Sequence, residues 1–157
     1  MLKKILKAAV IILAIGFITL QFFGIDKTNP PIVHSETLEA AVAVPPDVAL
    51  IMGRSCNDCH TNKTVYPWYA SIQPSGWYLK DHIDEGKRKL NLSKFNTFDK
   101  RKKIKKLEEI CEQVESSEMP LPSYLWIHWY AKLTESERTA LCDWTKQSIQ
   151  SIEDSER

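Results

Sequence analysis

The sequence predicts an all-α domain of about four helices, preceded by an apolar N-terminal segment. In several stretches apolar residues recur at three- and four-residue steps, which is the spacing of one face of a helix. No stretch alternates apolar and polar residues as a half-buried β-strand does, and no internal repeat is present. The chain has 157 residues and a net charge of +1, and this composition gives no indication of a nucleic-acid partner.

The chain divides into four parts. We expect a membrane anchor or signal at residues 1–24, a tether at 25–45, one folded domain at 46–152 and a tail at 153–157. The tether contains two proline pairs and few large apolar residues, which favours an extended chain. The folded part has about 110 residues, near the usual size of a domain.

The first part has the features of a membrane signal. Three lysines precede an apolar run from Ala8 to Leu20, which the next four residues extend to Gly24. The extended run is at the short end of what spans a bilayer, where about 20 residues are typical. We expect an inner-membrane anchor that crosses once, and a cleaved signal peptide is the alternative. Because the lysines keep the N-terminal end in the cytoplasm, the folded domain would lie in the periplasm or outside the cell, in an oxidising compartment.

Two helices are predicted in the first half of the folded domain. The first runs from Asp47 to Ser55, with a proline near its first position and apolar residues on one side. The second begins with Ser75 as its N-cap and continues to about Lys89. The segment between them is rich in aromatic residues and is expected to be a loop.

Two further helices are predicted in the second half. The third begins at Phe98 or Asp99, and its apolar residues recur at helical spacing at Ile104, Leu107, Cys111 and Val114. The fourth begins at a capping box formed by Thr134 and Glu137 and continues to about Ile152. A loop rich in proline and aromatic residues joins these two helices.

Residues 56–60 read Cys-Asn-Asp-Cys-His, which is the C-x-x-C-H signature for attachment of a c-type haem. Cys56 and Cys59 provide two thiols on neighbouring turns, so that both can form thioether bonds to the vinyl groups of one haem. His60 then lies under the porphyrin, where its imidazole binds the iron from the proximal side. An exported domain agrees with this interpretation, because bacterial c-type haem is attached there. The expected cofactor is therefore haem c.

A six-coordinate haem iron needs a second axial ligand, which is commonly methionine or histidine. Met119 lies in a loop far along the chain from His60, and Pro120 and Pro122 stiffen the backbone around it. We therefore expect Met119 as the distal ligand, whereas filling of a gap in the core is its structural alternative. His82, on the second predicted helix, is the alternative ligand and would give a lower potential.

Four further residues are expected to contact the cofactor, because a flat aromatic group packs well among rings. They are Trp68, Trp77, Tyr124 and His128. His128 is flanked by aromatic and apolar residues and is expected to pack near a haem edge or to donate to a propionate.

These motifs together resemble the small haem-binding domain family related to class I c-type cytochromes. The resemblance covers about residues 46–146 and rests on five segments: S-C-N-D-C-H-T-N, Y-P-W-Y, W-Y-L-K-D-H-I-D-E-G-K-R-K-L-N, E-M-P-L-P-S-Y and L-T-E-S-E-R-T-A-L-C-D-W. It implies a cytochrome c-like bundle around haem bound covalently at Cys56 and Cys59, with His60 as proximal ligand and Met119 as distal ligand. Members often have His-Pro where this chain has His128-Trp129, so the resemblance does not fix the role of His128.

The sequence leaves two interpretations open for Cys111 and Cys142. In an oxidising compartment the pair would form a disulfide, which would close a loop of about 32 residues and stabilise the fold by about 3–4 kcal/mol. The alternative is two buried thiols. A run of basic residues at 100–106 is either a docking surface for an acidic redox partner or anionic headgroups, or the solvated face of a helix.

The sequence thus favours a membrane-tethered monohaem c-type cytochrome that transfers single electrons on the exported side of a bacterial membrane and is not an enzyme. The redox partner protein is not identified. The alternative is a haem-based redox or small-gas sensor with a labile distal ligand. A thiol–disulfide oxidoreductase is disfavoured because the strands of its usual βαβ setting are not predicted, and a zinc site is disfavoured because a second ligand pair is missing.

Overall fold

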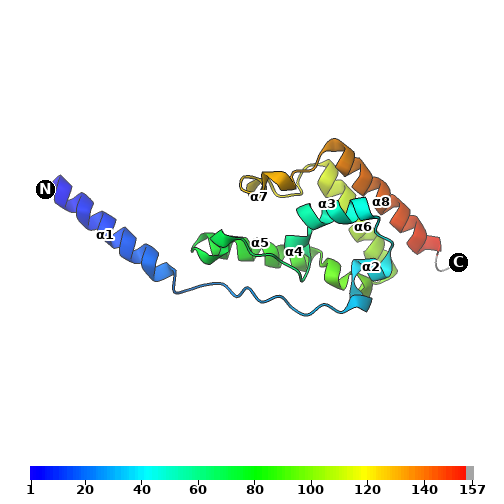
Figure 1. Cartoon of the computed structure of the whole chain (residues 1–157), viewed down its shortest axis with the longest axis horizontal. Coiled ribbons are helices and arrows are strands. Elements are labelled where there is room, and N and C mark those ends of the chain that lie inside the picture. Colours follow the sequence, from blue (N-terminus) through cyan, green and yellow to red (C-terminus); the bar gives the residue numbers. More distant parts are fainter. Residues whose placement is uncertain (155–157) are drawn as a thin grey trace.

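The computed structural model describes residues 1–154, and this part of the chain contains eight α-helices, four short 3-10 helices and no β-strand. The prediction of an all-α fold is confirmed. Figure 1 shows a helical domain with one separate helix, α1 (Leu2–Leu20), that extends away from it at the N-terminal end. Most of the tail predicted at 153–157 lies outside the described residues.

The four predicted helices are all present. They are α3 (Pro46–Ser55), α5 (Ser75–Lys89), α6 (Lys100–Glu115) and α8 (Glu135–Asp154). The segments expected to be loops contain shorter helices, namely α4 (Asn57–His60), η2 (Trp68–Ser71), η3 (Leu92–Thr97), α7 (Pro122–Leu125) and η4 (Trp129–Ala131). One turn each of η1 (His34–Glu36) and α2 (Leu38–Ala41) precedes α3.

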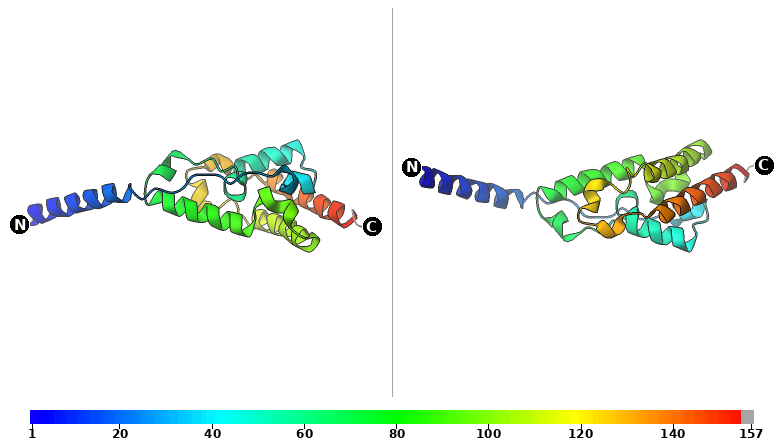
Figure 2. Two further views of the ribbon diagram at one scale, coloured as in Figure 1. Left: turned by 90° about the horizontal axis from the view of Figure 1, so that it is seen from below. Right: turned by 90° about the horizontal axis from the view of Figure 1, so that it is seen from above.

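Helices α6 and α8 pack side by side along their lengths and form one wall of the main core (Figure 2). Leu107 of α6 and Leu141 of α8 are buried there with Phe95 of η3. A disulfide joins Cys111 of α6 to Cys142 of α8, so the disulfide interpretation of this pair is confirmed. The wall is therefore held by a covalent bond as well as by apolar packing.

Helix α5 packs against the short helix α4 through a close contact of the two backbones. A side-chain carbon at Gly86 would lie 2.8 Å from the carbonyl oxygen of Cys59, which is closer than such a carbon approaches a backbone oxygen. Only glycine fits at this crossing without a shift of one helix. The crossing fixes the C-terminal half of α5 beside the C-x-x-C-H segment.

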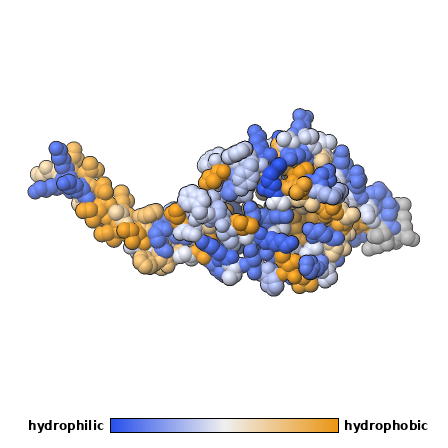
Figure 3. Space-filling view, in the orientation of Figure 1, coloured by the Kyte–Doolittle hydropathy of each residue, from blue (hydrophilic) through white to orange (hydrophobic). Residues whose placement is uncertain are grey.

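The N-terminal segment differs from the expected spanning anchor. Among residues 1–154, no helix is both long enough and apolar enough to cross a membrane. The physical reason is that Lys3, Lys4 and Lys7 lie inside α1, so its uncharged run is shorter than the helix. None of the α1 residues is buried against the rest of the chain, and Figure 3 shows an apolar surface along most of its length.

Residues 25–45 are extended for most of their length, as their prolines predict, but they are attached to the domain. The side chain of Asn29 donates to the carbonyl oxygen of Thr64 at 2.9 Å, and the indole of Trp144 donates to the carbonyl oxygen of Ala43 at 2.9 Å. Leu38 is fully buried in the core. The segment is a strap along the domain rather than a free tether, because its few apolar residues find places in the core.

Candidate functional site

The C-x-x-C-H segment lies at the sharp junction between α3 and α4. Helix α3 ends at Ser55, and Cys56 is the N-cap of α4. The backbone N–H of His60 donates to the carbonyl oxygen of Cys56 at 3.0 Å, which brings the two residues one helical turn apart. Residues one turn apart lie on the same side of a helix, so the first thiol and the imidazole face the same region.

The imidazole of His60 is oriented by the chain. Its Nδ1 lies 2.9 Å from the carbonyl oxygen of Leu90, the residue that ends α5. Because a carbonyl oxygen only accepts, Nδ1 carries the proton and Nε2 keeps a free lone pair. Burial lowers the pKa of His60, which favours the neutral ring. A neutral imidazole held by its second nitrogen is the usual form of a metal-ligating histidine.

The two cysteines of the segment are not activated as thiolates. Burial raises the pKa of Cys56 to about 12, with a smaller contribution from Cys59. Burial also raises the pKa of Cys59 to about 11, with the carboxylate of Asp58 adding to the effect. Thiol–disulfide exchange needs a thiolate, and its reactive cysteines usually have pKa values below the ordinary one. This electrostatic environment does not suit a thiol oxidoreductase.

A cavity of about 570 Å³ opens beside the C-x-x-C-H segment. His60 and Cys56 line one part of it and Met119 lines another, so residues from two distant segments meet at one cavity. Its apolar wall comes from α3, η3, α6, α8 and two connecting residues. The wall residues are Met52, Leu90, Leu92, Ile110, Val114, Leu133 and Leu141. Its volume is within the range of about 300–1,000 Å³ that small-molecule and cofactor pockets have.

The residues of this cavity fit a haem. An imidazole nitrogen and a thioether sulfur are an axial pair that haem iron takes, and an apolar wall suits the porphyrin. The rim carries charged groups, because Lys89, Lys106, Glu85 and Glu109 also line the cavity. Lys106 pairs with Glu109 within this rim, so its ammonium group lies at the boundary between the apolar wall and solvent. Such a boundary suits a ligand with one apolar body and a charged edge.

The Met119 loop is fixed to both neighbouring helices. Its backbone N–H donates to the carbonyl oxygen of Gln113 in α6 at 3.0 Å, and Pro120 is buried. Just before it, Ser117 has a left-handed backbone with φ of 61°, which turns the chain out of α6. The side chain of Arg138, in the first turn of α8, donates to the hydroxyl of Ser117 at 2.8 Å. The methionine is therefore held beside the cavity by the backbone on either side of it.

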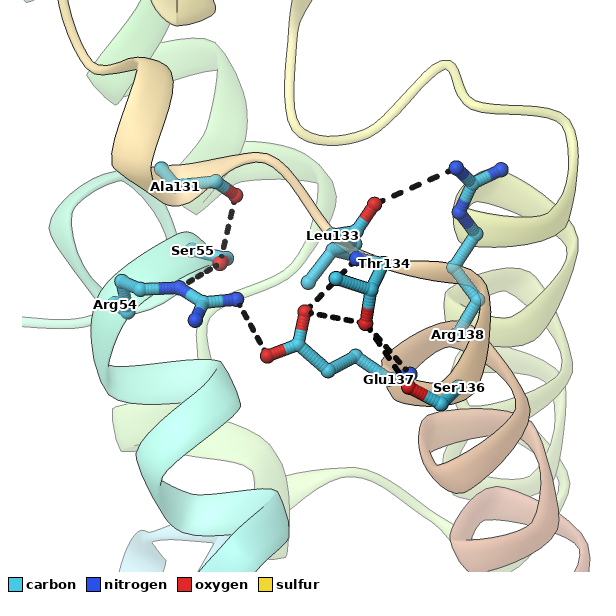
Figure 4. A network of polar contacts seen from close by, with 8 residues as sticks. All are labelled: Arg54, Ser55, Ala131, Leu133, Thr134, Ser136, Glu137 and Arg138. Atoms are coloured by element: carbon cyan, nitrogen blue, oxygen red, sulfur yellow. Dashed lines mark hydrogen bonds and ion pairs between the residues drawn. The ribbon is translucent and has the colours of Figure 1, made fainter.

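A network of polar contacts connects the end of α3 to the start of α8 (Figure 4). Arg54 donates to the carboxylate of Glu137 at 2.9 Å, and the hydroxyl of Ser55 donates to the carbonyl oxygen of Ala131 at 2.9 Å. Glu137 also accepts from the backbone N–H of Thr134 at 2.8 Å, and Thr134 accepts from the backbone N–H of Glu137 in return. The predicted capping box is confirmed. Its Glu137 also binds Arg54, which lies two positions before the C-x-x-C-H segment.

Glu137 is thus shared by a helix cap and an ion pair. Hydrogen bonds from Thr134 and Arg54 lower the pKa of Glu137, with the backbone donor of Thr134 as the largest cause. Through Arg54 on one side and Arg138 with Ser117 on the other, the start of α8 contacts both segments that contribute the candidate axial residues. The end of α3 and the start of the Met119 loop are therefore both attached to the first turn of α8.

His82 lies outside the cavity lining. Its Nδ1 donates to the carbonyl oxygen of Tyr78 at 2.8 Å, and its ring packs against the ring of Tyr78 with 4.2 Å between centroids. The cavity lining on α5 begins one helical turn later, at Glu85. The structure therefore brings Met119, and not His82, to the cavity that His60 lines.

The four expected aromatic contacts also lie outside this lining. Trp68 is exposed on η2, and the indole of Trp77 donates to the carbonyl oxygen of Phe23 at 2.8 Å. Tyr124 and His128 are stacked, with 4.1 Å between ring centroids, on the side of α4 that presents Asp58. These rings do not meet the cavity because their segments pack on the far side of α4 and at the start of α5.

The ring of His128 is the centre of a second polar cluster. Its Nε2 lies 2.8 Å from the hydroxyl of Tyr69 and its Nδ1 lies 2.7 Å from the hydroxyl of Tyr130. The hydroxyl of Tyr124 donates to the carboxylate of Asp58 at 3.3 Å. Burial lowers the pKa of His128, so the neutral ring is favoured. The cluster attaches the α7–η4 segment to the outer side of the C-x-x-C-H helix.

Sequence reasoning missed several residues that build the site. Leu90 orients His60 through its carbonyl oxygen, and no side-chain pattern signals such a contact. Arg54 and Glu137 join segments far apart in the chain. Gly86 is different, because an isolated glycine inside a helical pattern indicates a close approach to another segment. That signal was present in the sequence.

We expect Gly86→Ala to destabilise the domain by about 1–3 kcal/mol, the usual cost of overpacking. The added carbon would collide with the backbone of Cys59 and push α5 away from α4. The matched control is Gly53→Ala on α3, where the nearest atom lies 4.0 Å from the added carbon; it should gain about 0.5–1 kcal/mol from helix propensity. Chemical denaturation of both variants checks this, and equal stabilities would contradict the close crossing.

Among the described residues, the only group of three potential metal ligands is Cys111, Glu115 and Cys142. Its two cysteines are joined by the disulfide and have no thiolates to offer. Cys56, Cys59 and His60 do not form such a group within residues 1–154.

Comparison with known proteins agrees with this site. No curated protein and no solved structure is significantly similar to the chain. Residues 15–147 match the protein family described as a haem-binding domain. The match covers most of the chain, including the C-x-x-C-H segment, the cavity and the Met119 loop, and it supports a haem cofactor. The chain therefore belongs to the haem-binding domain family.

Proposed function

We propose that this haem protein is a monohaem c-type cytochrome that transfers single electrons between partner proteins. Cys56 and Cys59 would hold the haem through two thioether bonds, His60 would be the proximal ligand and Met119 the distal ligand. The observation that carries the proposal is that His60, Cys56 and Met119 line the same apolar cavity of about 570 Å³. Cys56 and His60 have the spacing of the C-x-x-C-H signature, and Met119 comes from a distant segment of the chain. A six-coordinate c-type haem is held by such a combination.

When bound, the haem supplies a one-electron redox couple. The chain's own residues would set its properties. Leu90 accepts from His60 and leaves the second ring nitrogen free to bind the iron, and the apolar wall would exclude water from a bound haem. The contacts of Gln113 and Arg138 hold the Met119 loop at the cavity, so a change of redox state need not move the protein. The role involves no bond chemistry on a substrate.

We also propose that α1 tethers the protein to the bacterial inner membrane and that the domain lies on the exported side. The large apolar residues of α1 from Leu2 to Ile18 are at least half exposed, so burial in lipid would remove them from water. The intact disulfide agrees with an oxidising compartment. The redox partner would be another protein of that compartment.

The test is the attachment of haem to the full-length chain, exported together with haem-maturation machinery. We expect haem to remain with the polypeptide through acid extraction, with the reduced absorption bands of a low-spin c-type haem. Cys56→Ala with Cys59→Ala should lose the haem, because both proposed thioether bonds are removed. Cys111→Ala with Cys142→Ala should retain it, because that pair forms the disulfide between α6 and α8. Haem that extracts freely from the unaltered chain would overturn the c-type proposal.

The sensor alternative makes a different prediction for the same preparation. A sensor with a labile distal ligand would bind added carbon monoxide rapidly in its unaltered reduced form. An electron-transfer protein with Met119 fixed at the iron would bind it slowly or not at all. The contacts that hold the Met119 loop favour electron transfer.

A further inference from the structure

Exposed aromatic side chains gather at the end of the domain from which α1 extends. The most exposed tryptophans are Trp126, Trp129 and Trp68, at 83%, 76% and 74% of their full exposure. Tyr78 and Tyr130 are also about half exposed. We call these five residues the aromatic end. In a soluble domain such large rings are normally buried, and a cluster of exposed ones marks a contact surface.

The aromatic end is one continuous surface, although its residues come from four segments. Tyr69 packs edge to face against Trp68 and bonds to His128, which in turn bonds to Tyr130. The hydroxyl of Tyr78 on α5 donates to Ser123 of α7 at 3.3 Å. These contacts fix η2, the start of α5, α7 and η4 against one another. The surface is therefore built before any partner binds.

The same end of the domain holds the base of α1. The side chain of Gln21 donates to the carbonyl oxygen of Gln73 at 3.1 Å and accepts from its backbone N–H at 2.9 Å. The indole of Trp77 donates to the carbonyl oxygen of Phe23 at 2.8 Å. Figures 1 and 2 show α1 leaving from the side of the domain where α7 and the start of α5 lie. The base of α1 therefore lies next to the aromatic end, on the same side of the domain.

We propose that the aromatic end lies in the headgroup layer of a lipid membrane, beside the point where α1 enters the lipid. This inference rests on the membrane tethering proposed above. Tryptophan and tyrosine are the residues that prefer this layer, because each has an apolar body and a polar group that stays wet. Lipid is the occupant we choose because the aromatic end continues directly from α1, whose apolar surface no other part of the domain covers.

This orientation has a consequence for the redox site. Tyr78 at the aromatic end and Lys89 at the cavity lie on the same helix, roughly 16 Å apart at 1.5 Å per residue. With the aromatic end in the headgroups, α5 would hold the cavity at a fixed height above the lipid. The haem would then be accessible to partners that diffuse along the membrane or in solution, and the domain would not rotate freely on its strap.

The test uses tryptophan fluorescence of the full-length haem protein in phosphatidylcholine vesicles. All five tryptophans lie outside α1, so quenching by brominated lipid reports contact of the domain and not of the helix. We expect stronger quenching with bromine near the headgroup than with bromine deep in the acyl chain. The ratio of emission in brominated and plain vesicles removes the effect of the haem, which is the same in both.

The matched variant is Trp126→Ser with Trp129→Ser, which removes two of the three most exposed tryptophans of the aromatic end. It should lose much of the quenching while still floating with the vesicles. Trp144→Phe, at a buried position, should keep it. Floating protein with unquenched tryptophans would overturn this inference but not the tethering, and would leave the aromatic end for a protein partner. Protein that does not float would contradict the tethering as well. Quenching unchanged in the double variant would place the lipid contact elsewhere and overturn the inference.

Discussion

We expect the Met119→Leu variant to keep its haem but to lose the low-spin spectrum of a six-coordinate iron. Leucine has nearly the same volume as methionine, so the cavity wall should remain packed, whereas the thioether sulfur is removed. Because thioether ligation raises the potential of a haem, the reduction potential should fall. The apparent affinity for carbon monoxide should rise by at least about tenfold, which corresponds to 1.4 kcal/mol. Absorption spectroscopy and carbon monoxide titration of the reduced protein measure both effects.

The matched control is Met52→Leu. Met52 is a buried methionine that lines the same cavity from α3, so this variant removes a thioether from the cavity without touching the loop. It should retain the low-spin spectrum. His82→Ala tests the rival ligand, and it should also leave the spectrum unchanged, because His82 bonds to Tyr78 outside the cavity. Loss of the low-spin spectrum in His82→Ala, with an unchanged spectrum in Met119→Leu, would reverse the assignment.

The helices of this protein were predictable because each carries a local signal. Glu137 lies three residues after Thr134, and this spacing alone indicates the capping box that begins α8. The periodic apolar residues of α6 likewise mark the face that packs in the core. The spacing of C-x-x-C-H places Cys56 and His60 one helical turn apart. All of these features depend on residues within about one or two turns of one another.

The parts of the site that were not predictable depend on contacts between distant segments. The partner of His60 is a backbone oxygen, which every residue has, so nothing in the sequence singles out Leu90. The aromatic residues were expected at the cofactor because rings are typical of cofactor pockets, but the cavity is lined by aliphatic side chains. Residue type favours a kind of environment, and only the packing of helices decides which surface receives it. The same limit applied to the strap, whose proline content predicted its extension but not its attachment.

Removal of the disulfide should have the largest effect on stability. We expect the Cys111→Ala, Cys142→Ala variant to lose about 3–4 kcal/mol of unfolding free energy, because the bond closes a long loop and restricts the unfolded chain. The haem should stay attached, since the thioether bonds would lie on the α4 side of the cavity. Urea denaturation, monitored by helix content, measures the loss. The free energy of unfolding is obtained from the urea concentration at the midpoint and the slope of the transition.

Treatment of the unaltered protein with a thiol reductant provides the matched comparison. Reduction should lower its stability toward that of the double variant, whereas the double variant itself should not respond, because a thioether is not reduced under these conditions. The neighbours of the two cysteines, Ile110 and Leu141, both line the cavity. A weaker α6–α8 pair should therefore loosen one cavity wall and admit carbon monoxide faster, even with Met119 present. If reduction costs stability but leaves this rate unchanged, the disulfide supports the fold alone and the wall is held by packing.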